Sequence, residues 1–476
     1  MRIPKLIALA LLASAACSIA QAKSQWQALK NKATFSAGAI ELLTDGTVIA
    51  HSEQDNSQLW YALTPDKSGS YVNGTWKQLA SMPEGYAPLY FGSAVLPDGR
   101  LVVEGGEYNN GQGDWTNLGA IYDPVKDSWT SVNPPAGWST IGDSQTAVLA
   151  DGTFMLANCC TTQDALLDAK LLTWTATGKH KADSNDEEGW TLLPNGDVLT
   201  IDLSNGTNSE VYNPKTGRWS SAGSTIVQLG SGAGIGPDVM MPDGTVFCTG
   251  ANDSGPGHTA IYNTRTKKWS VGPDFPDNLS IFDGPGSLEI NGKAIFMAGT
   301  GAFSTPSTFL EWDGSKLTEI QGPPNAPSDA AFEGHFLMLP SGQVMFTDFS
   351  TDIEIFTPKG TYKTAWQPTI TSAPSTVARG KSYLIKGAQF NGYSQGAAYG
   401  DDFQSATNYA LVRIVNNSTK HVFYARTANP STMGIQTGKA VVSTNFVLPK
   451  TAETGASTLY IVTNGIPSAG VSIMVK

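Results

Sequence analysis

The chain has 476 residues, a formal net charge of −11 and only 15% charged residues, with 50 Gly and 27 Pro. An acidic chain without a basic patch excludes nucleic acid and anionic membrane surfaces as expected partners. Many turn-forming residues and few helical patterns predict an all-β protein.

The N-terminus has the pattern of a secretory signal peptide. Arg2 and Lys5 precede an apolar run over residues 6–16, and a small-x-small cleavage site ends at residue 22. Cys17 raises a lipoprotein alternative, but no Leu stands three positions before it, so cleavage after residue 22 is expected. No later apolar run is long enough to span a membrane. The sequence therefore predicts a signal peptide at residues 1–22 and a secreted or periplasmic protein.

A turn flanked by two short apolar runs recurs seven times, at intervals of 44 to 53 residues. Asx-Gly between apolar runs is a strong hairpin signal, and we expect type I′ turns, in which both central residues have positive φ. The seven copies are Asp45-Gly46, Asp98-Gly99, Asp151-Gly152, Asn195-Gly196, Asp243-Gly244, Asn291-Gly292 and Ser341-Gly342.

Each copy continues to an aromatic or apolar residue and, in most copies, a Trp. Tyr122 leads to Trp129 and Tyr212 to Trp219, seven residues on in both cases. Each copy thus supplies about four strands, and seven such sheets bury their faces only when packed around an axis. We predict a seven-bladed β-propeller over residues 23–367. Two segments compete for the strand that closes the ring: the one beginning at Trp26, and residues 362–366.

The period ends near residue 368. Residues 368–374 are predicted as a linker. The residues that follow contain six or seven runs of β-formers separated by Gly, Asn and Pro clusters, the pattern of an Ig-like sandwich over residues 368–476. The runs are residues 382–385, 409–415, 421–426, 440–448, 458–462 and 470–475.

The repeat resembles the kelch-type propeller, with its turn Gly, Gly pair, Tyr and Trp; Gly105-Gly106 matches the Gly pair. A propeller followed by an Ig-like domain also resembles the galactose oxidase and glyoxal oxidase family of copper-radical oxidases. That resemblance implies a copper ion held by two Tyr and two His, with one Tyr cross-linked to a Cys and one His next to a Tyr.

The chain departs from this ligand pattern. None of its five His follows a Tyr, and residues 426–433, where the family would place a His, contain none. Copper is therefore not expected on these grounds, no metal-ligating residue is assigned, and the stronger resemblance is to secreted kelch proteins without a settled activity. The five histidines are His51, His180, His258, His335 and His421.

Aligning the seven copies on the turn Gly reveals an acidic position. Nine residues upstream stand Ala37, Tyr90, Asp143, Glu187, Ile235, Asp283 and Glu333, and Glu188, Trp190, Asp238 and His335 lie close by in sequence. We expect the side chains at this aligned position to gather at one mouth of the propeller. There it would bind a cation, calcium first, or a sugar stacked on Tyr90 or Trp190. The alternative is that each carboxylate accepts hydrogen bonds from the backbone N–H groups of its own turn and so stabilises that turn.

Cys159 and Cys160 are adjacent and occupy the place of the Gly pair in the third copy. Three states stay open: a vicinal disulfide, two reduced thiols, or one bridge to Cys248. Adjacent Cα atoms are only about 3.8 Å apart, so a vicinal bridge would be strained.

The sequence thus predicts an exported, monomeric binding protein that recognises a carbohydrate or an extracellular protein at the propeller mouth. The alternative is an enzyme: a diverged copper-radical oxidase, or a hydrolase that uses the mouth carboxylates. No catalytic residue is assigned, because the loops that would read a ligand carry no recognisable motif.

Overall fold

The computed structural model describes residues 25–53, 57–232, 234–252, 254–399 and 405–476. The predicted signal peptide, residues 1–22, lies outside these ranges. Within them the regular elements are almost all strands, with three short 3-10 helices: η1 (Pro276–Asn278), η2 (Ala331–Glu333) and η3 (Thr364–Trp366). No helix among the described residues is long and apolar enough to cross a membrane.

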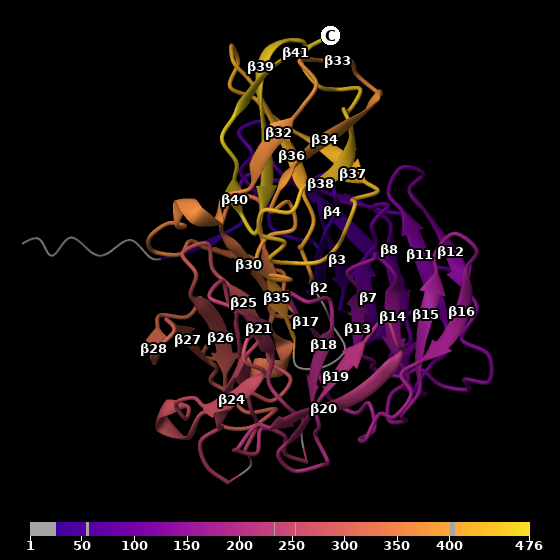
Figure 1. The fold of residues 1–476 in the computed structure, drawn as a ribbon, viewed down its shortest axis with the longest axis vertical. Helices are drawn as coiled ribbons and strands as arrows, with labels where there is room; N and C mark the ends of the chain where they lie inside the picture. The colour runs from indigo at the N-terminus through magenta and orange to yellow at the C-terminus, as the bar shows by residue number, and fades with distance from the viewer. Residues whose placement is uncertain (1–24, 54–56, 233, 253, 400–404) are drawn as a thin grey trace, which may run out of the picture.

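Seven antiparallel sheets each contain a meander of four strands, and one of them gains a fifth strand from the C-terminal residues; this is the arrangement of a β-propeller (Figure 1). First strands of neighbouring sheets contact one another in the pairs β2–β7, β7–β13, β17–β21, β21–β25 and β25–β29, and β29 contacts β2, so the last sheet joins the first. The first four sheets are β2 (Ala37–Leu42), β3 (Val48–Ser52), β4 (Trp60–Thr64), β5 (Thr75–Gln78); β7 (Gly92–Val95), β8 (Leu101–Glu104), β11 (Gly119–Asp123), β12 (Ser128–Val132); β13 (Thr146–Val148), β14 (Phe154–Ala157), β15 (Asp164–Asp168), β16 (Thr173–Thr177); and β17 (Thr191–Leu192), β18 (Val198–Ile201), β19 (Asn208–Asn213), β20 (Arg218–Ser224).

The remaining three sheets continue the pattern, and the last one takes its fourth strand from the N-terminus. They are β21 (Asp238–Met240), β22 (Thr245–Thr249), β23 (Thr259–Asn263), β24 (Lys268–Val271); β25 (Gly286–Leu288), β26 (Ala294–Ala298), β27 (Thr308–Trp312), β28 (Leu317–Ile320); and β29 (His335–Met338), β30 (Val344–Thr347), β31 (Glu354–Phe356), β1 (Trp26–Ala28).

The recurring Asx-Gly turn joins the first and second strands of every sheet, as expected, but the predicted turn type is wrong. Gly99 has φ +86° and its N–H donates to the carbonyl of Leu96 at 2.8 Å, whereas Asp98 keeps a negative φ. Pro97 fixes φ near −65°, which a type I′ turn does not allow there. The Asp98 carboxylate instead accepts the Arg100 N–H at 3.1 Å and so stabilises the turn.

The repeated aromatic and Trp positions face each other across the third and fourth strands. Tyr122 lies opposite Trp129, and Tyr212 opposite Trp219, with ring centroids 5.2 and 5.4 Å apart. In the last sheet Trp26 takes this place opposite Phe356. The N-terminal segment is therefore the closing strand, and residues 362–366 are not, because Thr364–Trp366 forms η3 outside the sheet.

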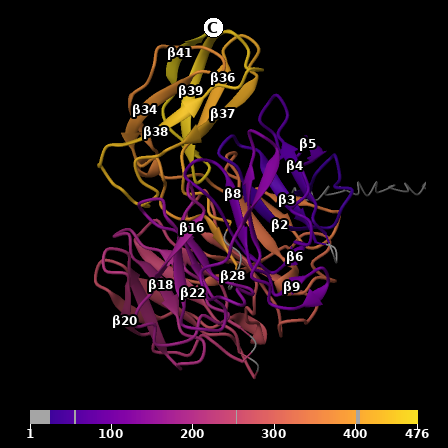
Figure 2. The ribbon, with the colours of Figure 1, turned by 90° about the vertical axis from the view of Figure 1, so that its right-hand side faces the viewer.

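The C-terminal residues form a separate group of strands that enclose their own hydrophobic core (Figures 1 and 2). All six predicted strand runs are present. The predicted linker is wrong at Thr369–Ser372, because these residues form β32 and pair with β34. The strands are β32 (Thr369–Ser372), β33 (Thr376–Val377), β34 (Ser382–Ala388), β36 (Leu411–Asn416), β37 (Val422–Ala428), β38 (Val442–Val447), β39 (Gly455–Thr463), β40 (Ile466–Pro467) and β41 (Val471–Val475).

This C-terminal group packs on the side of the sheets that carries the Asx-Gly turns. The Thr44 hydroxyl donates to the Thr427 carbonyl at 2.8 Å, and the Thr432 hydroxyl to the Ala150 carbonyl at 2.8 Å. Each first strand begins at the end away from its Asx-Gly turn. The beginnings of the first strands therefore lie on the opposite side of the sheets, which this group does not cover.

One C-terminal segment extends along the first strands toward that opposite side. Its strand β35 (Ala397–Ala398) pairs with β25 and contacts β21 and β29. The Gln395 side-chain oxygen accepts the Leu192 N–H at 2.7 Å, and the Ser405 hydroxyl donates to the Phe336 carbonyl at 2.7 Å. The segment therefore lies among the innermost strands of several sheets.

Candidate binding pocket

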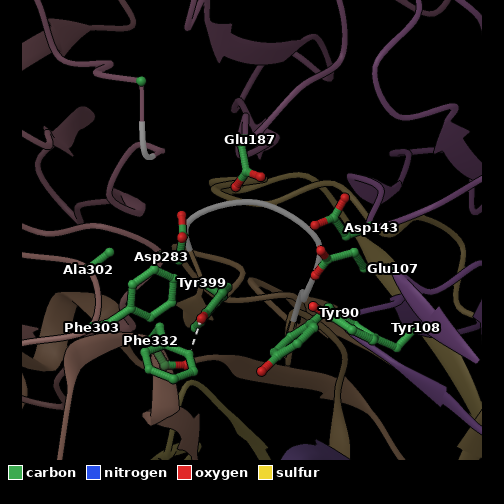
Figure 3. Close-up of a pocket in the computed structure, with 11 residues that line it drawn as sticks. Tyr90, Glu107, Tyr108, Asp143, Glu187, Asp283, Ala302, Phe303, Phe332 and Tyr399 are labelled. Atoms are coloured by element: carbon green, nitrogen blue, oxygen red, sulfur yellow. Dashed lines mark hydrogen bonds between the residues drawn. The ribbon is translucent and has the colours of Figure 1, made fainter. Parts of the chain in front are cut away.

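A pocket of about 340 Å³ lies on the side of the sheets opposite the C-terminal strands (Figure 3). Its volume falls within the range of small-molecule sites. Residues from several sheets and from the C-terminal segment contribute to it. The lining residues are Tyr90, Glu107, Tyr108, Asp143, Glu187, Gly232, Asp283, Ala302, Phe303, Phe332 and Tyr399.

Four of the predicted mouth residues line this pocket, and the local backbone explains why. Tyr90, Glu187 and Asp283 adopt φ values of +51°, +53° and +42° just before β7, β17 and β25. Asp143 follows Gly142, which has φ +73°. A left-handed residue redirects the chain sharply as it turns into the first strand of the sheet. A left-handed residue at this position, or just before it, in four of the repeats therefore brings these side chains to one mouth.

The lining divides into an acidic part and an aromatic part. Figure 3 shows the carboxylates of Glu107, Asp143 and Glu187 together with that of Asp283 in the upper part of the view, and aromatic rings in the lower part. Phe303 and Phe332 meet edge to face with centroids 5.2 Å apart. The ring centroids of Tyr90 and Tyr108 lie 6.0 Å apart. A ligand in the pocket would contact both kinds of surface.

Tyr399 brings the C-terminal segment into the pocket. Its ring stacks on His335, with centroids 5.1 Å apart and planes 8° from parallel, and its hydroxyl donates to the Phe332 carbonyl at 2.6 Å. His335 is buried at the start of β29, so it supports Tyr399 and is not itself a lining residue. Sequence reasoning missed Tyr399 because residues beyond the repeats carry no period that points to the mouth.

Other lining residues also escaped the repeat alignment. Glu107 and Tyr108 belong to an insertion in the second sheet, where β6 (Pro88–Leu89), β9 (Tyr108–Asn109) and β10 (Gln112–Gly113) form a small additional sheet. Phe303 lies in the loop before β27, and Phe332 lies in η2, just before β29. These loops vary in length, so counting from the turn Gly cannot align them.

Three predicted mouth residues lie elsewhere. Glu188 is buried and paired with Lys181 at 3.0 Å, and Trp190 packs 5.7 Å from Trp219 in the core. The Glu333 carboxylate accepts the Ala330 N–H at 2.7 Å, as expected if each acid holds its own turn.

Lys181 lies in a buried acidic cluster. Its ammonium is 2.8 Å from Glu210, 3.0 Å from Glu188 and 3.9 Å from Asp202. Burial by itself lowers the pKa of Lys181, but these carboxylates outweigh burial and raise it. The ammonium is therefore held below the surface and does not face the pocket.

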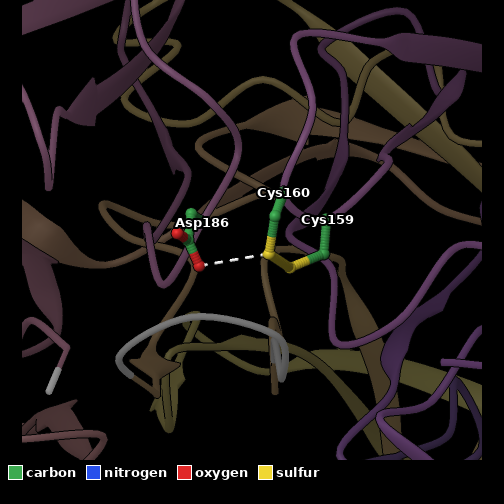
Figure 4. A group of neighbouring side chains, drawn as sticks. All are labelled: Cys159, Cys160 and Asp186. Atoms are coloured by element: carbon green, nitrogen blue, oxygen red, sulfur yellow. Dashed lines mark hydrogen bonds between the residues drawn. A yellow bond between two sulfur atoms is a disulfide. The ribbon is translucent and has the colours of Figure 1, made fainter. Parts of the chain in front are cut away.

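Cys159 and Cys160 are joined as a vicinal disulfide in the structure, beside Asp186 (Figure 4). The Cys160 sulfur lies 3.2 Å from an Asp186 carboxylate oxygen. Cys248 is a buried free thiol. The Cys159 N–H donates to the Ile141 carbonyl at 3.0 Å, which ties the pair to the backbone just before Asp143.

The residues present do not match a copper site with two His and two Tyr. His335 stacks on Tyr399, but the other described histidines are engaged elsewhere: His51 with Glu53, His258 with Asp274 and His421 with Glu453. His180 lies in the loop between β16 and β17 and is not in the lining. We therefore derive no chemistry through copper.

The pocket carboxylates are also spread too widely for a preformed calcium site. Among the described residues, the one group that brings three metal-binding atoms within 4.8 Å of one another is Cys159, Cys160 and Asp186. Calcium takes six to eight oxygens at about 2.3–2.6 Å. The acidic residues thus surround a cavity and do not converge on one point, so calcium binding stays a prediction for calorimetric titration.

The sheets and the pocket together define a β-propeller with a cavity at one mouth. No protein-family model matches the chain, and no curated protein matches its sequence. Among solved structures it is similar to a fungal alcohol oxidase of the AA5 family in complex with copper, with a TM-score of 0.52 and 15% identity over 95% of this chain and 98% of that one.

Two further similar structures are lyases. They are a streptogramin B lyase (TM-score 0.47, 14% identity, 69% of this chain and 96% of that one) and virginiamycin B lyase from Staphylococcus aureus (TM-score 0.48, 11% identity, 69% and 98%). At these identities the comparisons show fold alone.

Proposed function

We propose that the chain is an exported binding protein that recognises a carbohydrate in the pocket of a seven-bladed, kelch-like propeller. Residues 23–367 form the propeller, and residues 368–476 form an Ig-like sandwich that supports it, in the galactose oxidase-like architecture. The observation that carries the proposal is the pairing of aromatic rings and carboxylates around one cavity.

A sugar presents both of the surfaces that such a cavity binds. The apolar C–H face of a sugar ring stacks on aromatic side chains, and Phe303 and Phe332 offer rings at the rim. Sugar hydroxyls donate hydrogen bonds to carboxylates, and hydrogen bonds with an ionised partner are stronger than neutral ones.

The size of the pocket favours a saccharide over an extracellular protein. A stable protein interface buries about 800 Å² on each partner and is commonly flat, whereas this site is a concave cavity of about 340 Å³. A protein partner that binds through the pocket would have to insert a side chain or a glycan. The protein is expected to act as a monomer.

An enzyme is the second candidate, favoured by the similarity of almost the whole chain to a copper-bound alcohol oxidase. Copper content, together with peroxide release on galactose or glyoxal, tests an oxidase. Release of reducing ends from a bound glycan tests a hydrolase that uses the pocket carboxylates. If the protein is metal-free and binds a glycan without turnover, the enzyme is excluded and the binding function is supported.

A glycan array is the direct test, followed by variants of the aromatic part. Phe303 is 80% exposed, so Phe303→Ala should leave the fold intact while weakening glycan binding. Tyr90→Ala should act in the same direction. Trp366→Ala is the matched control, because Trp366 lies against Gly292 on the opposite side of the propeller. Unchanged binding in both pocket variants would overturn the proposed site.

A further inference from the structure

A group of three side chains, Cys159, Cys160 and Asp186, brings metal-binding atoms together (Figure 4). The two sulfurs and a carboxylate oxygen lie within 4.8 Å of one another, and the Cys160 sulfur is 3.2 Å from an Asp186 oxygen. In a tetrahedral zinc site, a sulfur and an oxygen ligand lie about 3.6 Å apart, because their bonds to zinc are about 2.3 and 2.1 Å long. Asp186 is therefore close to the position of a third ligand beside the two sulfurs.

The disulfide prevents this group from binding a metal in its oxidised state. Thiolates are the sulfur ligands of zinc, and bonded sulfurs carry no thiolate charge. We propose that Cys159, Cys160 and Asp186 form a binding site for a thiophilic divalent cation of the zinc type, which becomes available when an external thiol reduces the disulfide. Calcium and magnesium prefer oxygen ligands and are not expected there. This site is independent of the proposed carbohydrate function.

The reduction has a defined balance and an accessible starting point. The Cys160 side chain is exposed, whereas Cys159 is buried. An external thiolate attacks the Cys160 sulfur, forms a mixed disulfide and breaks the bond to Cys159, whose sulfur takes up a proton. A second external thiol attacks the mixed disulfide and releases the Cys160 thiol. Two electrons from two external thiols therefore yield two cysteine thiols and one small-molecule disulfide.

Backbone hydrogen bonds hold the ligand-bearing segments together without help from the disulfide. The Cys159 N–H donates to the Ile141 carbonyl at 3.0 Å. The Asn185 N–H donates to the Thr161 carbonyl at 2.6 Å, which joins the segment that carries the carboxylate to the segment that carries the sulfurs. The three ligands therefore stay near one another after reduction, as a preorganised metal site requires.

A divalent cation also balances the charge of the reduced group. Two thiolates and the Asp186 carboxylate within 4.8 Å of one another repel unless a cation lies between them. Each thiol must lose its proton to become a ligand, so binding of one ion releases two protons. The affinity for the metal should therefore rise with pH.

The test measures metal binding by the full-length mature protein before and after reduction. Dithiothreitol is added and then removed without oxygen, and the thiol count of the denatured protein should rise from one, Cys248, to three. Zn²⁺ is then titrated calorimetrically into both forms. We expect one Zn²⁺ to bind per reduced chain, at least about 100-fold more tightly than to the oxidised chain. Co²⁺ in place of Zn²⁺ should give the charge-transfer absorption of a cobalt thiolate.

Variants identify the ligands. Cys160→Ser and Asp186→Asn should each weaken Zn²⁺ binding by the reduced protein at least about tenfold, because each removes a ligand. The matched controls are Cys248→Ala, which removes the remaining cysteine, and Asp277→Asn, which removes an exposed carboxylate elsewhere. Both controls should bind Zn²⁺ as the wild-type protein does. Thermal melting of each variant checks that its fold is intact.

Four results would overturn the metal site. The first is equal Zn²⁺ affinity of the reduced and oxidised proteins, and the second is unchanged binding in Cys160→Ser. The third is loss of binding in Cys248→Ala with the fold intact, which would locate the metal elsewhere. The fourth is a thiol count that stays at one after dithiothreitol, since the disulfide would then be closed to external thiols. The glycan array tests the carbohydrate function separately, so either can fail without the other.

Discussion

Trp26 of β1 lies directly opposite Phe356 of β31, with ring centroids 4.8 Å apart. This is the same cross-strand relationship that joins Tyr122 to Trp129 within the second sheet. The Trp26 indole N–H also donates to the Gln321 carbonyl at 2.7 Å, which ties β1 to the preceding sheet. The last sheet is therefore completed by residues more than 300 positions away in sequence, and β1 in place of β31 forms its outer edge.

Removing the Trp26 ring should destabilise the closed propeller. Trp26 is buried against Phe309, Phe346 and Phe356. We expect Trp26→Ala to lower the free energy of unfolding by about 3–5 kcal/mol, since it leaves a cavity among these rings. Denaturation by urea measures the change. Trp366→Ala, in the segment that does not close the ring, should cost clearly less, and equal losses would contradict the closing role of β1.

A turn glycine should resist a side chain for conformational reasons alone. Gly196 has φ +87°, and a Cβ there would lie 3.4 Å from the Ala150 side chain, an ordinary contact. Gly196→Ala should therefore cost about 1–2 kcal/mol from the left-handed backbone, and Gly196→Asn less, because Asn tolerates this region. The midpoint of urea unfolding measures the loss of stability in each of the two variants.

Gly255→Ala is the control for the turn glycine. Among the described residues, a Cβ at Gly255 meets no atom closer than 3.6 Å, and the φ of Gly255 is not in the left-handed region, so this variant should be nearly neutral. An equal loss in Gly196→Ala and Gly196→Asn would show that backbone conformation is not the cause.

Buried acids should make the protein more stable at acidic than at alkaline pH. Burial raises the pKa of Asp238 from 3.8 to about 7, so between these values the folded protein holds a proton that the unfolded chain has lost. This stability is fully present below pH 3.8 and is lost as the pH rises through about 7. We expect the melting temperature to fall between pH 5 and pH 8.

Asp238→Asn should flatten that pH dependence, because Asn mimics the protonated carboxyl. The difference in stability between pH 5 and pH 8 should shrink by at least about 1.4 kcal/mol, the value of one pKa unit. The exposed Asp277→Asn variant serves as the comparison and should keep the wild-type profile. A wild-type protein that is more stable at pH 8 than at pH 5 would contradict this expectation.

The disulfide state of Cys159 and Cys160 can be decided by peptide mapping. In denatured but unreduced protein, alkylation should label Cys248 and leave Cys159 and Cys160 unlabelled within one peptide. Reduction should then expose both for labelling. A cross-linked peptide that contains Cys248, or full labelling without reductant, would support one of the other two states.

The repeated turns and the aromatic pairs could be predicted from sequence because they depend on local chemistry. A positive φ favours Gly wherever the turn recurs, and an antiparallel register places residues such as Tyr212 and Trp219 opposite each other. The same period located Tyr90, Asp143, Glu187 and Asp283 at one mouth. Sequence could not choose between Trp26 and residues 362–366 for closure, since both carry suitable aromatics.

The tertiary structure alone decided which side chains complete the pocket. Tyr399 reaches it because the C-terminal segment runs along β25, a pairing between residues about 110 positions apart that no local pattern encodes. Glu188 and Trp190, adjacent in sequence to the mouth, are instead buried with Lys181 and Trp219. The repeat fixes where a backbone enters the mouth, whereas the direction of each neighbouring side chain depends on packing between elements distant in sequence.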